Sequence, residues 1–584
     1  MTKFLERKPI RILFAVAIIL NLAFFCFLYY FIPTPFIIGR FIRLDLVYGS
    51  VNYPTCLDPL NATDKPSQNV IDQVVEQLYQ FNISDPDLPI VPWLATNFPT
   101  ISPDGKEYTI TIRQGIKFHD NITMNATAVK WSFDRLCYFM NYSGNADLPA
   151  PFNVPLPDTI LPTQLGILYE QADGKRVINQ TEVLSTYSVK ITLNAPKASF
   201  ISLLCYTGSG ILSPTSTPAL EYYELHEKLV GTGPFKYIYF MADVEVRFAG
   251  FADYWGTPAD TGPTKLDTVT YVIVADVTTM NNGLLVGDID ITDHVDPPFI
   301  AQFQADPNIE IVMGGNTVTC AWTTFNYDHI DLAMRRGLSW CFNYSYSIEV
   351  ISEGQALRWP TYIPNGIPYA NYSLDYPVYN VAKARGYLLN DSVYGSILSA
   401  AGIDENSPDS AWMALADGIT PLASLNYTYN FGNTVGEENG YRLSYDARYI
   451  GVDIDVFGVA WDDLFDMITL ERHKMDMYAF GWAPDYFDTE NYITPLYSNT
   501  SAINGGNFYE PDVQQLMDDG LTESNPVARE AIYQEIQRLM VEEYLPAMTL
   551  HTGINYDAWQ TYVHGWFPNP IERVWFYPCY GYIS

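Results

Sequence analysis

The feature that most limits how this chain can fold is a long apolar run near its N-terminus. Residues 12–32 are almost all apolar, with Asn21 as the only interruption. As a helix, this run is long enough to cross the hydrocarbon core of a bilayer, which is about 30 Å thick. A secretory signal core is shorter and ends at a small-residue cleavage site, whereas Pro33-Thr34-Pro35 follows here. The run therefore predicts an uncleaved transmembrane signal anchor.

The flanks of this run predict its orientation. Four basic residues precede it, and basic flanks stay in the cytoplasm. We therefore expect residues 1–11 to be a cytoplasmic flank, residues 12–32 a membrane helix and residues 33–43 a linker. The rest of the chain is expected outside the cell, held at the cell membrane by a single pass.

Sequons and cysteines agree with an extracellular location. Eleven N-x-[Ser/Thr] sequons are candidate N-glycosylation sites: Asn61, Asn82, Asn121, Asn125, Asn141, Asn179, Asn343, Asn371, Asn390, Asn426 and Asn499. Six cysteines follow the apolar run: Cys56, Cys137, Cys205, Cys320, Cys341 and Cys579. An even number outside the cell permits up to three disulfides, and free buried cysteines are the alternative.

Charge and length limit the class of protein. The chain carries 66 acidic and 32 basic residues, a net charge of −34. Such a field repels nucleic acid and anionic lipid surfaces, so no nucleic-acid partner is expected. The 584 residues exceed what one hydrophobic core holds, about 250–300 residues, so several domains are expected.

Strand and helix patterns are mixed throughout the extracellular part. Residues 108–112 and 189–193 alternate apolar and polar side chains, as half-buried strands do. Apolar residues from Ile71 to Leu78 have the i, i+3, i+4, i+7 spacing of a helix, and Pro511 is placed to begin another. The mixture predicts an α/β fold with several subdomains.

One carboxylate lies in an uncharged aromatic segment, residues 481–487. Gly481 permits close approach of another backbone, and Trp482 offers a flat apolar face. Asp485 would be partly desolvated there and would favour a cationic partner. Taken alone, the segment fits either a turn capped by Asp485 or a pocket that stacks a ligand on Trp482 and holds its positive group.

Further blocks accompany this segment in a definite order: 57–59 (LDP), 108–120 (YTITIRQGIKFHD), 231–235 (GTGPF), 253–256 (DYWG), 287–290 (GDID), 332–338 (LAMRRGL), 354–356 (GQA) and 545–547 (LPA). The ordered set resembles the extracellular solute-binding proteins of peptide-type ABC importers, the oligopeptide-, dipeptide- and nickel-binding family. The resemblance covers nearly all of residues 44–584. The glycines of the GTGPF block are expected to serve a tight structural turn rather than ligand contact.

The resemblance implies an α/β, two-lobed periplasmic-binding-protein clamp with three structural domains and the ligand at the hinge. Residues 44–88, 206–288 and 546–584 would form lobe I. Residues 89–205 would form an inserted domain II, and residues 289–545 would form lobe II, which is domain III.

The resemblance also implies which residues bind. In peptide-binding members the Gly-Trp-x-x-Asp segment lines the site, and its aspartate takes the free α-amino group of the ligand. Here Gly481, Trp482, Ala483 and Asp485 match those positions. Lesser candidates for the cavity wall, which could equally be core residues, are Tyr53, Tyr206 and Trp322.

Two positions depart from the family pattern. Ala479 stands where some oligopeptide binders place an arginine for the ligand carboxylate, and Asn343 stands where an acidic residue is usual. Without a basic partner for a free carboxylate, longer peptides or neutral ligands such as oligosaccharides stay open.

The leading hypothesis is a substrate-binding component that delivers extracellular oligopeptides or dipeptides to ABC permease subunits with cytoplasmic ATPases. One alternative is an oligosaccharide receptor on the same fold, and another is a cell-surface structural protein that reuses the clamp. The seven histidines form no HExxH pair, and no G-x-S-x-G elbow, P-loop or dinucleotide fingerprint occurs. Neither an enzyme nor a cofactor is expected.

Overall fold

The computed structural model describes residues 41–583, apart from positions 44, 63, 86–87, 142–144, 158, 161–162, 164–168, 170–174, 226 and 257–261. The predicted membrane helix 12–32, its cytoplasmic flank and the linker up to residue 40 lie outside the described residues. Within the described residues, no helix is both long enough and apolar enough to span a bilayer.

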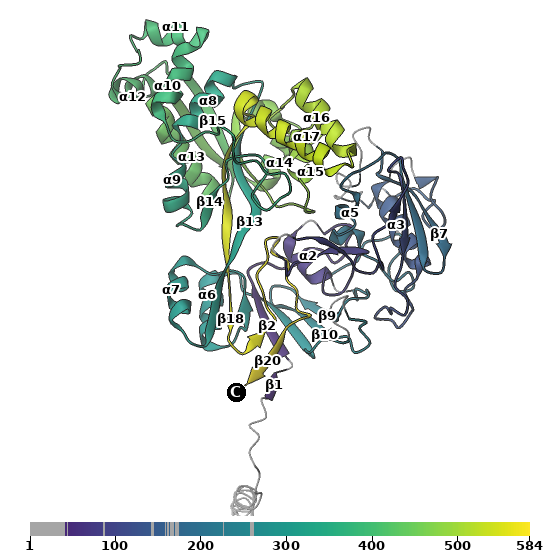
Figure 1. The fold of residues 1–584 in the computed structure, drawn as a ribbon. Helices are drawn as coiled ribbons and strands as arrows, with labels where there is room; N and C mark the ends of the chain where they lie inside the picture. The colour runs from purple at the N-terminus through teal and green to yellow at the C-terminus, as the bar shows by residue number, and fades with distance from the viewer. Residues whose placement is uncertain are drawn as a thin grey trace, which may run out of the picture.

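One sheet of eleven strands runs through two lobes (Figure 1). Its two longest strands, β13 (Ile309–Phe325) and β18 (Ala547–Gln560), pair antiparallel and extend from one lobe into the other. Their register shifts near Asn316 and again between Ala321 and Trp322. Such irregularities bend and twist a strand pair, so the chain crosses between the lobes along a bent two-stranded connection.

The lower lobe in Figure 1 is built on a mixed part of this sheet. Two strands lie parallel to β2 on either side of it, and β9 and β10 continue antiparallel to the edge. These strands are β2 (Asp45–Ser50), β9 (Phe235–Met241), β10 (Glu245–Gly250), β11 (Thr268–Ile273) and β12 (Ile291–Thr292). The helices are α2 (Lys65–Ile71), α6 (Val277–Val286) and α7 (Pro297–Ala305). A small sheet joins the two ends of the described chain: β1 (Phe41–Arg43), β19 (Val563–His564) and β20 (Tyr580–Ile583).

The glycines of the GTGPF block are structural, as predicted. A Cβ built on Gly231 would lie 2.1 Å from the carbonyl oxygen of Val74, and one on Gly233 would lie 2.6 Å from that of Gln73. Only glycine permits this approach of two backbones.

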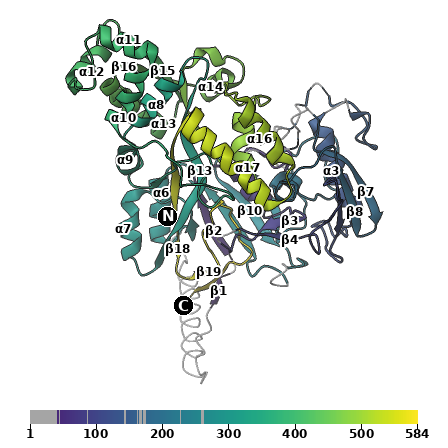
Figure 2. The ribbon, with the colours of Figure 1, turned by 45° about the horizontal axis from the view of Figure 1, so that its top comes forward.

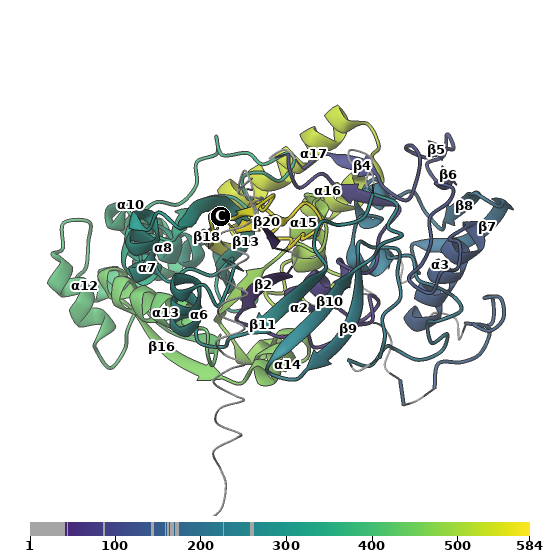
Figure 3. The same cartoon turned by 90° about the horizontal axis from the view of Figure 1, so that it is seen from below.

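A separate unit beside the lower lobe carries its own sheets (Figure 3). Its strands are β3 (Tyr79–Phe81), β4 (Ile90–Pro92), β5 (Thr100–Ile101), β6 (Glu107–Thr111), β7 (Ile178–Ser185) and β8 (Ser188–Leu193). Its helices are α3 (Ala126–Met140) and α5 (Phe200–Leu203). The strands predicted at 108–112 and 189–193 are therefore present, as β6 and within β8.

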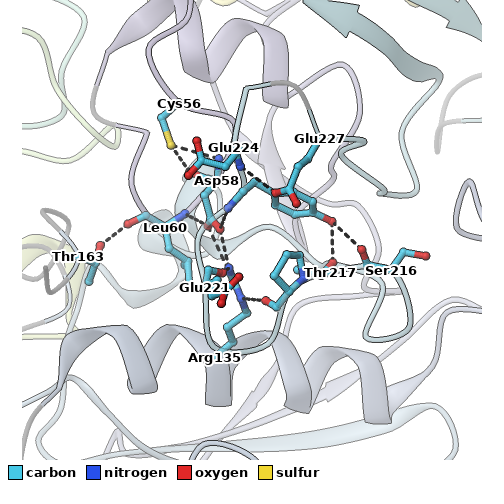
Figure 4. Close-up of polar contacts among 12 residues, drawn as sticks. Cys56, Asp58, Leu60, Arg135, Thr163, Ser216, Thr217, Glu221, Glu224 and Glu227 are labelled. Atoms are coloured by element: carbon cyan, nitrogen blue, oxygen red, sulfur yellow. Dashed lines mark hydrogen bonds and ion pairs between the residues drawn. The ribbon is translucent and has the colours of Figure 1, made fainter. Parts of the chain in front are cut away.

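A buried ion pair ties this unit to the lower lobe (Figure 4). Arg135 on α3 donates from Nη1 and Nη2 to the two oxygens of Asp58, at 3.0 and 2.5 Å. Asp58 also accepts from the backbone N–H groups of Leu60 and Tyr223, both at 3.0 Å. Neither charged side chain is exposed. The aspartate of the LDP block is thus a structural partner of Arg135.

The upper lobe covers the other end of the sheet with helices. Its strands are β14 (Ala356–Arg358), β15 (Ala423–Asn430), β16 (Val452–Val459) and β17 (Met477–Trp482). Its helices are α8 (Leu332–Cys341), α9 (Tyr344–Tyr346), α10 (Val381–Asn390), α11 (Ser392–Ala400), α12 (Asp409–Ala416), α13 (Thr434–Ala447), α14 (Trp461–Thr469), α15 (Glu490–Tyr497), α16 (Pro511–Thr522) and α17 (Pro526–Arg538). Pro511 begins α16, as predicted.

The hydrophobic packing bears on the domain boundaries. Phe303 of α7 shares a buried cluster with Met280 and Leu284 of α6 in the lower lobe, whereas Met548 and Leu550 of β18 belong to a cluster of the upper lobe. We therefore propose boundaries inside β13 and β18, in place of those predicted at 288/289 and 545/546.

The structure shows the exposure of the cysteines and of the sequon asparagines. The six cysteines after the apolar run are all free, Cys56 partly exposed and the others buried. This matches the alternative of free buried cysteines, so no disulfide links the described residues. The eleven sequon asparagines are each at least partly exposed, and their glycosylation stays a prediction.

Candidate ligand-binding site

The predicted binding segment continues from strand β17 in the upper lobe. β17 pairs with β13, with Gly481 opposite Ala321 and Trp482 opposite Cys320. On its other side, β17 pairs with β15 only at Met477 and Tyr478. The backbone edge of residues 479–482 is thus outside the β15 pairing. Gly481 is exposed there.

Asn491, at the start of α15, holds the loop that follows β17. Its Oδ1 accepts from Trp482 Nε1 at 3.1 Å and from the Asp485 N–H at 2.9 Å. Its Nδ2 donates to Asp485 Oδ2 at 3.2 Å. Sequence reasoning missed Asn491, because an asparagine six residues beyond the aspartate carries no distinctive local signal.

Asp485 differs from the acids that follow it. The two carboxylate oxygens of Asp488 accept hydrogen bonds from Nη1 and Nη2 of Arg529, at 2.9 and 2.8 Å. Glu490 accepts from Lys197 Nζ at 2.5 Å. Within the described part of the chain, no cation pairs with Asp485. Burial raises the pKa of its carboxyl from 3.8 to about 6, and the Asn491 hydrogen bond opposes this rise.

A cavity between the lobes holds this carboxylate. It contains about 490 Å³ of space between atoms, part of which is open to solvent. Residues 484–487 line it from the upper lobe, and α2 with its cap Asp72 lines it from the lower lobe. Phe81, in the unit beside the lower lobe, also lines it, with its ring 5.8 Å from that of Phe487.

The upper lobe also contacts the β3–β8 unit through α16, which lies beside that unit in Figure 2. The N–H of Ala198 donates to the carbonyl oxygen of Leu521 at 2.8 Å, close to the Lys197–Glu490 ion pair. The upper lobe and the β3–β8 unit therefore contact each other beside the cavity.

The predicted site residues are distributed unevenly around this cavity. Asp485 and Tyr206 line it, and the Tyr206 hydroxyl donates to the carbonyl oxygen of Ala62 at 3.2 Å. Gly481, Trp482 and Ala483 immediately precede the lining residues along the chain. Their contacts with a ligand stay a prediction.

The other two candidates lie elsewhere. Trp322 is buried in the core, with its ring 5.6 Å from those of Trp359 and Phe480. Tyr53 is exposed in the loop after β2 and is not among the residues that line this cavity. Their binding roles gain no support from this arrangement.

Two cations that sequence reasoning did not find line the same cavity. Lys65 Nζ donates to the carbonyl oxygen of Ile571 at 2.6 Å, and Arg573 Nε lies 3.1 Å from Asp72 Oδ2. Burial lowers the pKa of Lys65, and Glu572 opposes that shift. The two cations are more than 500 residues apart in the chain, so no local pattern links them with Asp485.

The described residues form no candidate metal site. In the ranges that the structure describes, no three His, Cys, Asp or Glu side chains are grouped so that they could hold a metal ion.

Comparison with known proteins places this fold. Residues 89–504 match the family model of bacterial extracellular solute-binding proteins, family 5 Middle. The di/tripeptide-binding protein 1 of Pseudomonas aeruginosa is 25% identical over 556 residues, which cover 91% of this chain and 93% of that protein.

Two solved structures share the fold. The periplasmic binding protein DppA of Helicobacter pylori, in complex with the peptide STSA, matches with a TM-score of 0.70 and 22% identity, covering 93% of this chain and 98% of that one. The dipeptide-binding protein of Pseudoalteromonas sp. SM9913, in complex with Met-Leu, matches with a TM-score of 0.70 and 21% identity, covering 92% and 99%. Since the family model spans more than two thirds of the chain and the fold agrees over nearly all of it, this protein belongs to family 5 of the bacterial extracellular solute-binding proteins.

Proposed function

We propose that this protein captures extracellular oligopeptides or dipeptides and delivers them to an ABC permease. The observation that carries the proposal is Asp485, a carboxylate in a cavity between the lobes that pairs with no cation among the described residues. The ligand's α-ammonium group would bind there, because a charge-assisted hydrogen bond is strong where water is scarce. The relatives and solved neighbours named above are peptide binders, which supports the same ligand class.

The open edge of β17 supports an extended ligand. The β15 pairing ends at Tyr478, so a ligand backbone could hydrogen-bond to residues 479–482 as an added strand. In such binding, main-chain bonds supply most of the affinity and side-chain pockets supply preference. The proposal therefore includes broad tolerance of ligand side chains.

Hinge closure would couple binding to delivery. The cavity takes its walls from both lobes, and β13 and β18 carry the chain between them. A ligand that contacts both walls favours the closed arrangement by the difference in its affinity for the two states. Permease subunits would recognise the closed form, and their cytoplasmic ATPases would drive transport. No catalytic step on the ligand is part of this proposal.

The finer organisation belongs to the same proposal. We infer three structural domains, with the β3–β8 unit as the inserted one. Its start would then lie before β3 (Tyr79–Phe81) and not at the predicted residue 89. A single membrane helix at residues 12–32 would hold the extracellular part at the cell surface, close to the permease.

Calorimetry with the full-length protein in detergent tests this function. The probes are a random pool of free tripeptides and the same pool after N-acetylation. The free pool should bind, and acetylation should weaken binding about ten- to a hundredfold, because it removes the ammonium charge that Asp485 accepts. Equal affinity for both pools would exclude the amine role of Asp485. Binding of oligosaccharides with no response to either pool would replace peptides as the ligand class.

A further inference from the structure

The cavity beside Asp485 has one carboxylate on its upper wall and two cations with one carboxylate, Asp72, on its lower wall. Asp485 comes from the upper lobe, whereas Lys65 and Arg573 come from the lower lobe. Asp485 accepts a side-chain hydrogen bond from Asn491, Arg573 pairs with Asp72, and Lys65 donates to a backbone carbonyl. The carboxylate and the two cations therefore border one space without forming ion pairs with each other.

The guanidinium of Arg573 has unused donors. Its Nε and Nη2 are buried and make no hydrogen bond to the residues that the structure describes, although Nε lies 3.1 Å from Asp72 Oδ2. Asp72 is already engaged, since its Oδ1 accepts from Gln77 Nε2 and Thr207 Oγ1, both at 3.0 Å. Only 7% of Arg573 is exposed. The ion pair with Asp72 leaves Nη2 as a buried charged donor with no acceptor among the described residues. Such a donor is costly, and a ligand oxygen would relieve that cost.

The main chain around Arg573 is firmly held. Its N–H donates to Asn569 Oδ1 at 3.0 Å, and its carbonyl oxygen accepts from Asn569 Nδ2 at 2.8 Å. The carbonyl oxygen of Val574 accepts from Gln73 Nε2 at 2.8 Å, which ties the segment to the end of α2. A donor positioned before the ligand arrives loses little freedom on binding.

We propose that Arg573, with Lys65 beside it, binds the free carboxylate of a short zwitterionic ligand whose amino group lies at Asp485. This rests on the proposed function and adds the second end of the ligand. Arginine suits the role because its planar fork matches the two oxygens of a carboxylate. The two charged ends would be held by different lobes, so only a ligand with both ends free would bridge the lobes fully. The site would prefer short peptides with free termini to long or blocked ones.

A purely structural role for Arg573 predicts a different result. Arg573 also borders a second cavity, of about 360 Å³, which is lined by Asp293, Asp557 and Glu572. If the guanidinium only offsets these carboxylates, its removal should weaken all ligands by the same factor. If it binds the ligand carboxylate, its removal should affect only ligands that carry one.

A double-mutant cycle between protein and ligand separates the two roles. Wild-type protein and Arg573→Gln are each titrated with the free tripeptide pool and with the same pool after C-amidation. Amidation should weaken binding to wild type about ten- to a hundredfold, because it removes the ligand's negative charge. In Arg573→Gln, amidated and free pools should bind within about twofold of each other. Arg573→Lys should restore part of the sensitivity to amidation, since it keeps the charge but not the fork.

Three controls distinguish a specific loss of carboxylate binding from general effects of the substitution. Arg448→Gln removes an arginine that pairs with Asp417 at the surface of the upper lobe, and it should retain the full effect of amidation. N-acetylation should still weaken binding to Arg573→Gln, which shows that the Asp485 end is intact. If Arg573→Gln does not fold, Lys65→Gln takes its place in the cycle and should likewise reduce the effect of amidation.

The possible failures are distinguishable. If the free pool binds but amidation costs the same factor in wild type and in the Arg573 or Lys65 variant, or nothing in wild type, the carboxylate role is refuted and peptide capture survives. If no pool binds, whatever its termini, the proposed function itself fails.

Discussion

Replacing Asp485 by asparagine should stabilise the unliganded protein while weakening its ligand. The carboxyl pKa rises from 3.8 to about 6 on folding, because burial removes water from the charged form. For a carboxyl whose folded pKa is raised, stability is lost as pH rises between the unfolded and folded values. At 1.36 kcal/mol per pKa unit, the ionised group costs about 3 kcal/mol at most at pH 7.5. Since the side chain is partly exposed to the cavity, we expect Asp485→Asn to gain about 1–3 kcal/mol.

Thermal unfolding measures this gain. For a chain of this length, about 1–3 kcal/mol corresponds to a rise of about 1–3 °C in Tm, if the chain unfolds cooperatively. The rise should be present at pH 7.5 and nearly gone at pH 4, where the wild-type carboxyl is protonated in the folded state. Binding of the free tripeptide pool should show the opposite trend. Wild-type affinity should fall about tenfold between pH 7.5 and pH 5, where about one tenth of Asp485 is ionised, and the affinity of Asp485→Asn should not change for this reason.

Asp488→Asn is the matched control, three residues away. Asp488 pairs with both ends of Arg529, and leaving a buried guanidinium without its partner costs about 3–5 kcal/mol. This variant should therefore melt below wild type at pH 7.5, whereas Asp485→Asn melts above it. The reasoning is wrong if Asp485→Asn has a lower Tm than wild type at pH 7.5, or if its higher Tm persists unchanged at pH 4. Either result would mean that the ionised Asp485 carboxylate does not destabilise the folded protein.

Three further predictions concern the framework. Asp58→Asn should lower stability by about 3–5 kcal/mol, because Arg135 loses its buried charged partner; an unchanged Tm would contradict this. Gly231→Ala places a Cβ 2.1 Å from the carbonyl oxygen of Val74 and should lower the yield of folded protein. Gly386→Ala lies in α10, where no atom of the described residues comes within 4 Å of the new Cβ, and it should raise the free energy of unfolding by up to about 1 kcal/mol. Similar Tm values for the two variants would count against the close approach at Gly231. Burial raises the pKa of Asp557 from 3.8 to about 8, so stability should fall as pH rises from about 4 to about 8 and level off above that, and Asp557→Asn should flatten that fall in Tm; equal slopes would exclude Asp557 as its source.

Local patterns predicted much of the fold. The alternation at 108–112 and 189–193 corresponds to β6 and β8, and Pro511 begins α16. These elements can be predicted from sequence because side-chain periodicity depends on neighbours within a few residues. The ordered blocks likewise led to the family, since each lies within a short stretch of chain. The same stretch pointed to Asp485, because an acid in an apolar aromatic segment is unusual wherever the chain folds.

Other features depend on residues far apart in the chain. Trp322 was a candidate for the cavity wall, yet the packing of Trp359 and Phe480 buries it in the core. Whether Asp485 finds a cation, and whether the cysteines lie close enough to pair, cannot be inferred from spacing along the chain. Contacts of this kind form only when distant segments meet, and the local sequence of neither segment determines their geometry.

The chain's local sequence thus specifies several of its strands and helices, its family and one acidic end of the candidate site. The helix predicted from Ile71 to Leu78 was wrong, because α2 ends at Ile71. The other end of the site required the folded molecule. β13 and β18 carry the chain from one lobe to the other and back, and that path brings Lys65 and Arg573 to the cavity that holds Asp485. The physical reason is range: hydrophobic periodicity acts over a few residues, whereas the pairing of charges depends on where the backbone has placed them.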